Sequence, residues 1–187
     1  TGIFAVTALG IRPVAGPAMD YFRKDRLLTL SIGVITLSFA CYGFARGIPM
    51  LVAARLLHGF GIGLSAPLSL ALVTNILPAG KIASGLGVFS LGSAVATAVG
   101  PSIGLKLADV IGYNNTFFIC TALMAACFGL SLRIRADIPE RAERFKISLN
   151  QIVAPEVILP TLVIFFQIIS FSSINSFIAI YGGLAGV

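Results

Sequence analysis

Polar residues divide the chain into six long apolar segments, at about residues 1–19, 27–45, 50–77, 82–107, 114–132 and 157–181. A helix that crosses a bilayer needs about 20 mainly apolar residues; the last five segments reach that length and the first is shorter. Because lipid offers no hydrogen-bond partner to backbone amides, spanning segments must be continuous helices. The pattern predicts an all-α integral membrane fold with six transmembrane helices, the first truncated.

Lysine and arginine residues are concentrated in alternate connections between these segments. One side of the predicted bundle carries Arg23, Lys24, Arg26, Lys81, Arg133, Arg135, Arg141, Arg144 and Lys146. The opposite side has Arg46 and, near a helix end, Lys106. Cytoplasmic connections are enriched in positive residues, so the connections at 20–26, 78–82 and 133–156 are predicted to be cytoplasmic. We therefore expect a multi-pass protein of the cell membrane.

The connection at 133–156 is longer than the others and has its own periodicity. Its apolar residues recur at alternating steps of four and three, at Ile138, Ala142, Phe145, Leu149 and Ile152. This spacing makes one apolar stripe on a helix, and charged residues cover the other side. The pattern predicts an amphipathic helix that lies along the cytoplasmic surface. The alternative is a disordered linker with accidental periodicity.

The composition supports a membrane protein. Of 187 residues, 57% are hydrophobic and 11% are charged, whereas a soluble domain carries roughly 25% charged residues. The net charge of +6 does not indicate nucleic-acid binding, because the basic residues lie between apolar segments rather than on one soluble face. Cys41, Cys120 and Cys127 lie inside apolar segments without metal-ligand spacing, so we interpret them as buried thiols.

No group of residues indicates catalysis. The segments contain no His/Glu metal cluster and no Ser/His/Asp set at plausible depth, so we expect no enzyme activity, cofactor or metal. The sequence starts at Thr1 without a signal-peptide pattern and ends within apolar residues. We therefore expect an internal fragment of a longer polypeptide.

Charge is densest between the first two segments, in a stretch expected to be a short, water-exposed loop. Gly16 permits another helix to approach closely at the membrane edge. Asp20, at a helix end, can accept hydrogen bonds from a facing helix N-terminus and pair with a cation. Arg23, Lys24 and Arg26 are candidate cations. The alternative is an ordinary cytoplasmic loop that is basic because of its side of the membrane.

The third segment contains an arginine and the single histidine of the chain. Arg55, Gly59 and Gly63 are four residues apart and form one stripe on a helix. An arginine within the membrane is costly and is a functional candidate, although Arg55 could snorkel to the nearby outer surface. Because imidazole titrates near physiological pH, His58 is a proton-coupling candidate together with Arg55. The alternative is that His58 hydrogen-bonds a neighbouring helix.

The fourth segment has small residues at every fourth position, at Gly92, Ala96, Gly100 and Gly104. This spacing predicts a groove for close contact with another helix. Pro101 lacks a backbone amide hydrogen, so we expect a bend there. The alternative is a glycine-rich packing helix with no further role.

These features together resemble the major facilitator superfamily of secondary transporters, in which two six-helix halves are joined by a long cytoplasmic loop. The resemblance would make the segments helices two to seven. It implies an N-terminal half without helix one (1–132), an inter-half loop (133–156) and the start of the C-terminal half (157–187). The family's signature between helices two and three reads roughly G-x-L-A-D-R-x-G-R-K/R. Gly16, Asp20, Lys24 and Arg26 match it, whereas Ala18, Tyr21 and Arg23 depart from it.

The resemblance implies roles for these residues. In the family, the loop after helix two locks the cytoplasmic side shut, which implies a gate at residues 16–26. An arginine in helix four, here Arg55, is linked to proton coupling in related antiporters. The drug–proton antiporter branch has a helix-five pattern, G-x-x-x-G-P-x-x-G-G; Gly100, Pro101 and Gly104 fit it, and Leu105 departs from it.

We therefore expect a secondary active transporter that moves a small molecule by alternating access, with proton-coupled efflux. No aspartate or glutamate lies deep within the six segments, so a proton-carrying carboxylate, if the transporter uses one, is expected in the helices outside this sequence, of which helix one is an example. Gln167 and Asn175 are candidates for lining the substrate cavity; the alternative is that they satisfy contacts between helices. The expected partners are a small-molecule substrate, protons, the bilayer, and the remaining helices of the polypeptide (one and eight to twelve), without nucleic acid. The alternatives are a proton-coupled uptake symporter and a non-transporting membrane scaffold or receptor.

Overall fold

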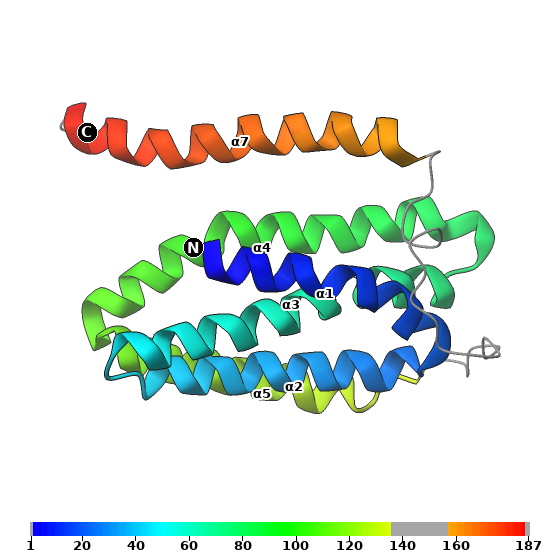
Figure 1. Cartoon of the computed structure of the whole chain (residues 1–187), viewed down its shortest axis with the longest axis horizontal. Coiled ribbons are helices and arrows are strands. Elements are labelled where there is room, and N and C mark those ends of the chain that lie inside the picture. Colours follow the sequence, from blue (N-terminus) through cyan, green and yellow to red (C-terminus); the bar gives the residue numbers. More distant parts are fainter. Residues whose placement is uncertain (1, 136–156, 186–187) are drawn as a thin grey trace. The chain divides into compact units, whose positions relative to one another are not determined.

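The computed structural model describes residues 2–135 and 157–185. Its elements are α1 (Gly2–Tyr21), α2 (Lys24–Gly43), α3 (Ile48–Ile76), the 3-10 helix η1 (Ala79–Lys81), α4 (Ile82–Ile111), α5 (Tyr113–Ser131) and α7 (Ile158–Ala185) (Figure 1). By length and composition, five stretches of the described residues can cross a membrane: α1, α2, α3, α5 and η1 with α4. The predicted all-α membrane fold is confirmed. The predicted amphipathic helix falls on residues 136–156, outside the described ranges.

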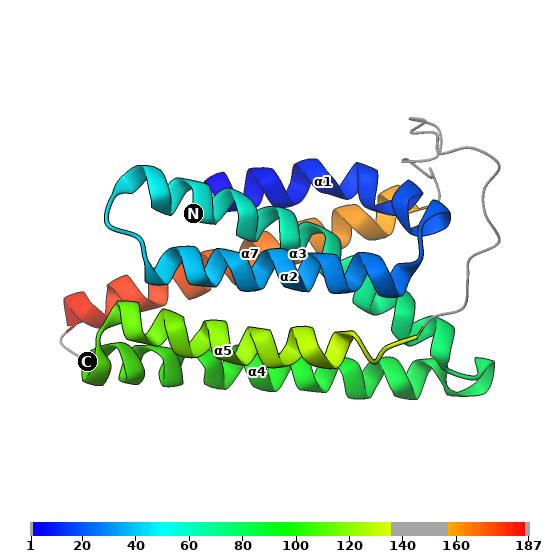
Figure 2. The ribbon, with the colours of Figure 1, turned by 90° about the horizontal axis from the view of Figure 1, so that it is seen from below.

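The chain divides into two compact units, Thr1–Lys146 and Ile147–Val187. In the first unit α3 packs against α1 and α2, and α2 packs in turn against α5. Figure 2 shows α2 between α3 and α5, with α4 running beside α5. The described part of the second unit is α7, a helix of 28 residues that is apolar over Ile158–Ile174.

The core of the first unit lies where α1, α2 and α3 meet. It contains Ala15 of α1, Leu28 of α2 and the α3 residues Leu64, Leu68 and Leu72. Many large apolar side chains of the helices instead face outward, as expected for surfaces that contact lipid rather than water. α3 is therefore the central helix of these three, and the helices that carry the candidate site pack around it.

Proline and glycine set the helix ends. Pro49 occupies the first turn of α3, where its missing amide hydrogen has no intrahelical role. Leu77, directly before Pro78, is extended and ends that helix. Gly112 has a φ of +82° and separates α4 from α5. In Figure 1, α4 changes direction along its length, and Pro101 lies inside this helix.

The expected water-exposed loop between the first two segments is mostly helical, so that prediction was wrong. α1 continues to Tyr21 and α2 starts at Lys24, so that only Phe22 and Arg23 separate them. Asp25, in the first turn of α2, is only 6% exposed. It lies about one helical turn before a buried leucine and shares its face. Because this stretch carries many charged residues, the helical spacing of its buried positions was not recognised from the sequence.

Candidate functional site

An ion pair fixes the connection between α1 and α2. The Arg23 guanidinium donates to both oxygens of the Asp25 carboxylate, from Nε to Oδ1 at 3.1 Å and from Nη2 to Oδ2 at 2.6 Å. The Arg26 amide also donates to Oδ1 at 2.9 Å. Arg23 is the N-cap of α2 and Asp25 lies in its first turn, where a negative charge is favoured by the helix dipole. The side-chain hydrogen bond from Arg23 to Asp25, together with the charge of that carboxylate, raises the pKa of Arg23. The Arg23 guanidinium therefore stays protonated in the pair.

The other residues of the predicted gate lie around this pair. Asp20, at the end of α1, is exposed and forms no ion pair with any described residue. Arg23, one of its predicted partners, is paired with Asp25 instead. Lys24 Nζ lies 3.0 Å from the side-chain amide of Asn75 in α3 and donates to it when the amide oxygen faces it. Thus acid and base are brought together here, but with a different carboxylate from the expected one.

A polar contact joins α2 to α5 one turn further along. The Ser131 hydroxyl donates to Phe128 O at 2.7 Å and lies 3.2 Å from the Thr29 hydroxyl. Thr29 Oγ1 in turn donates to Asp25 O at 3.0 Å. This contact ties the end of α5 to the same turn of α2 that carries the ion pair.

Arg55 and His58 belong to an aromatic cluster near the other end of α2 and α3. The Arg55 guanidinium carbon lies 5.4 Å from the centre of the Tyr42 ring, a distance typical of a cation–π contact. The His58 ring is 5.2 Å from the ring of Phe4, 5.1 Å from that of Phe39 and 6.0 Å from that of Tyr42. Arg55 itself is exposed.

Two buried polar atoms of this cluster have no hydrogen-bond partner among the described residues, namely His58 Nδ1 and the Tyr42 hydroxyl. Buried polar atoms are normally satisfied, so each of these two can take a hydrogen-bond partner such as a water or a group from another helix. Sequence reasoning found Arg55 and His58 but missed Tyr42. Its position on the face of α2 that carries Asp25, Leu28 and Ile35 could have indicated it.

The two predicted small-residue stripes have different surroundings. A Cβ added at Gly59 would lie 2.5 Å from Phe4 O, and one at Gly63 would lie 2.8 Å from Ala8 O. These glycines therefore allow α3 to approach α1. At Gly92, Gly100 and Gly104 in α4, an added Cβ would meet nothing within 4 Å. The helix contact predicted for the α4 stripe thus has no counterpart in the described residues and stays a prediction.

Arg12 is a further charged residue within a membrane-length helix, and sequence reasoning missed it. It lies near the middle of α1, and among the described residues it pairs with no carboxylate. It lines a hollow of about 460 Å³ between α1 and α3, together with Gly16, Met19, Pro67 and others. A single arginine within the first apolar segment was the available signal.

The predicted cavity residues lie in α7. Gln167 is exposed on that helix, and the side chain of Asn175 falls outside the described residues. Their role as lining for a substrate cavity stays a prediction.

Comparison with known proteins agrees with this architecture. The sequence model of the Major Facilitator Superfamily matches residues 1–187, which is the whole chain. The chain belongs to the Major Facilitator Superfamily.

Curated relatives from the superfamily include drug-resistance proteins. The chain is 33% identical to an uncharacterized MFS-type transporter of Mycobacterium tuberculosis, over 71% of this chain and 23% of that protein. It is 28% identical to multidrug resistance protein 1 of Bacillus subtilis, over 95% of this chain and 47% of that protein. Identity with multidrug resistance protein MdtG of Proteus mirabilis is 34%, over 59% and 27% of the two chains. The chain thus spans less than half the length of these superfamily members.

Proposed function

We propose that the polypeptide is a secondary active transporter that moves a small molecule across the membrane by alternating access, as proton-coupled efflux. The observation that carries this proposal is the whole-chain match to the Major Facilitator Superfamily. The direction of transport is inferred from relatives that are named as multidrug resistance or efflux proteins. The helix-five residues Gly100, Pro101 and Gly104 point the same way through their resemblance to the antiporter pattern.

In this proposal the connection between α1 and α2 is the cytoplasmic gate. The Arg23–Asp25 pair holds the start of α2 in place, because a charged residue pair with two hydrogen bonds has a defined geometry. Asp20 remains exposed beside it. A helix N-terminus or cation from the other half of the polypeptide can meet Asp20 in one state and leave it in the other. Gly16 leaves room for that approach.

The aromatic cluster at the opposite end of α2 and α3 is the proposed site of proton coupling. Its basis is the proximity of the Arg55 charge to Tyr42 and the unpartnered Nδ1 of His58. A proton on His58 would introduce a second positive charge next to Arg55, and like charges repel. Taking up the proton therefore favours a conformation that separates the two residues or brings a carboxylate from the rest of the polypeptide.

Transport into everted membrane vesicles tests the proposed function. The full-length polypeptide that carries this sequence is expressed, and uptake of lipophilic cations, neutral antibiotics and organic acids is followed with and without a pH gradient. Efflux predicts that at least one class accumulates when the vesicle interior is acidic, and that a protonophore abolishes the accumulation. Gradient-driven movement in the opposite direction would indicate an uptake symporter instead. No protein-dependent flux of any class would favour the scaffold or receptor alternative.

A further inference from the structure

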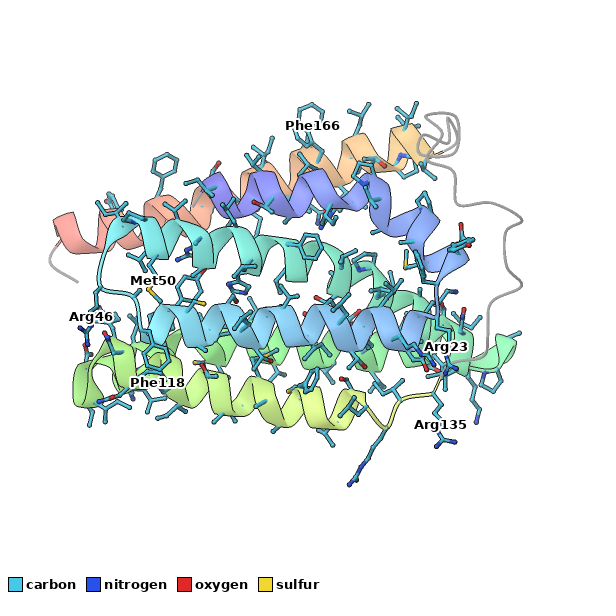
Figure 3. All side chains as sticks on the ribbon, turned by 60° about the horizontal axis from the view of Figure 1, so that its bottom comes forward. Arg23, Arg46, Met50, Phe118, Arg135 and Phe166 are labelled. Carbon is cyan, nitrogen blue, oxygen red and sulfur yellow. The ribbon has the colours of Figure 1, made fainter. Side chains whose placement is uncertain are left out.

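A basic hollow of about 670 Å³ lies between α2 and the C-terminal end of α5. Its charged lining residues are Arg23, Asp25, Arg26 and Arg135. Figure 3 shows Arg23 and Arg135 at the same end of the helices, opposite the end that carries Arg46. Arg23 is paired with Asp25, whereas Arg26 and Arg135 pair with no carboxylate among the described residues. The hollow thus contains two guanidinium groups that lack a protein counter-ion there.

The rest of this hollow is apolar and follows the two helices. Leu30, Val34 and Leu37 of α2 face Phe128 of α5 across it. Gly33 lets the Phe128 ring lie close against α2, because a Cβ at that position would lie only 3.1 Å from the ring. A polar anion that is dissolved in water gains no favourable contact from such a long apolar wall.

A second hollow of about 330 Å³ continues the first. It shares Gly33, Leu37 and Phe128 with the first and extends along the same helices to Ala40. Between Arg26 and Ala40, α2 rises by about 21 Å at roughly 1.5 Å per residue. One leaflet of the hydrocarbon core is about 15 Å thick. The two hollows together, here called the α2–α5 groove, are long enough for one acyl chain.

We propose that the α2–α5 groove binds an anionic phospholipid. Arg26 and Arg135 hold the phosphate, whose oxygens match the planar donor pattern of guanidinium groups. An acyl chain lies along Leu30, Val34 and Leu37. A zwitterionic lipid fits the apolar wall equally well but brings its own positive charge to two unpaired arginines. Basic pockets between transmembrane helices are known to suit acidic headgroups, and the charge of this groove therefore favours an acidic lipid over a neutral one.

The test compares two lipids that differ in headgroup charge. The full-length polypeptide is purified in detergent, and dioleoylphosphatidylglycerol or dioleoylphosphatidylcholine is titrated while bound lipid is counted by native mass spectrometry. We expect phosphatidylglycerol to bind about tenfold more tightly, since each arginine near a membrane surface attracts acidic lipid. Replacing both arginines, in R26Q/R135Q, is expected to remove this preference. Arg133→Gln is the matched control, because Arg133 follows the same helix but does not line the groove.

The location is tested by photocrosslinking from position 34. A photoreactive residue in place of Val34 is expected to form an adduct with phosphatidylglycerol in wild-type background, and to lose it in Arg135→Gln, whose site follows α5 and is exposed. Equal affinity for the two lipids, or a preference that survives in R26Q/R135Q, would overturn the proposal. It would also be overturned if position 34 crosslinked to polypeptide in place of lipid, because another protein segment would then fill the groove.

Discussion

Replacing Gly63 by alanine tests the contact between α1 and α3. The added Cβ would collide with the Ile11 side chain and lie 2.8 Å from Ala8 O and 3.1 Å from Ala8 Cα. Ile11 can change rotamer, but the backbone of Ala8 can move only with α1. Overpacking of this kind typically destabilises by about 1–3 kcal/mol. For a domain of this size that corresponds to a fall in melting temperature on the order of 2–10 °C.

The assay is thermal unfolding of the full-length polypeptide in detergent, followed by size-exclusion chromatography with fluorescence detection. Gly129→Ala is the matched control: Gly129 also lies within a helix, but it is exposed, and a Cβ there meets nothing within 4 Å. This variant is expected to melt at the wild-type temperature or slightly above it, because alanine favours helix. Equal melting temperatures for Gly63→Ala and Gly129→Ala would refute the close approach of α1 and α3.

Four further substitutions separate structural from functional roles in the full-length polypeptide. Asp25→Asn removes the buried charge of the Arg23–Asp25 pair and should lower the melting temperature, and an unchanged value would contradict a structural role. Asp20→Asn should abolish flux in proteoliposomes. Membrane insertion and melting temperature should not change, because Asp20 is exposed and forms no described ion pair. Unchanged flux would refute the proposed gate. Arg12→Gln should insert more readily, since an arginine at a helix centre costs about 2.5–3.5 kcal/mol, but should transport less; full transport would show that Arg12 has no functional role. Gly92→Leu should lower the melting temperature if the α4 stripe packs on the rest of the polypeptide, and a wild-type value would contradict that contact.

Apart from α1, the helices could be predicted from the sequence because each lies in a continuous apolar run of spanning length; α1 was expected to be truncated but has 20 residues. α3 and α5 begin and end within two residues of the predicted segments, at Ile48–Ile76 and Tyr113–Ser131. The turn before α2 could not be predicted in the same way. Charge density is a property of composition, whereas the burial of Asp25 depends on which face of α2 meets its neighbours.

The spacing of residues in the sequence could not by itself predict which side chains pair with each other. Asp20 has the position of the family's acidic residue, but Arg23 is closer to Asp25 because both lie at the start of one helix. Likewise, glycines four apart occur in both α3 and α4, and only those of α3 face another described helix. Spacing defines a stripe on a helix and leaves open what covers it.

Proton movement that depends on substrate is the most direct test of the proposed efflux mechanism. The full-length polypeptide is reconstituted in proteoliposomes that contain a pH-sensitive dye, a substrate identified in the vesicle assay is added, and the internal pH is recorded. Proton-coupled antiport predicts that substrate moving in one direction drives protons in the other, with the response lost in Asp20→Asn. Substrate flux with no change of internal pH would contradict the proposed coupling.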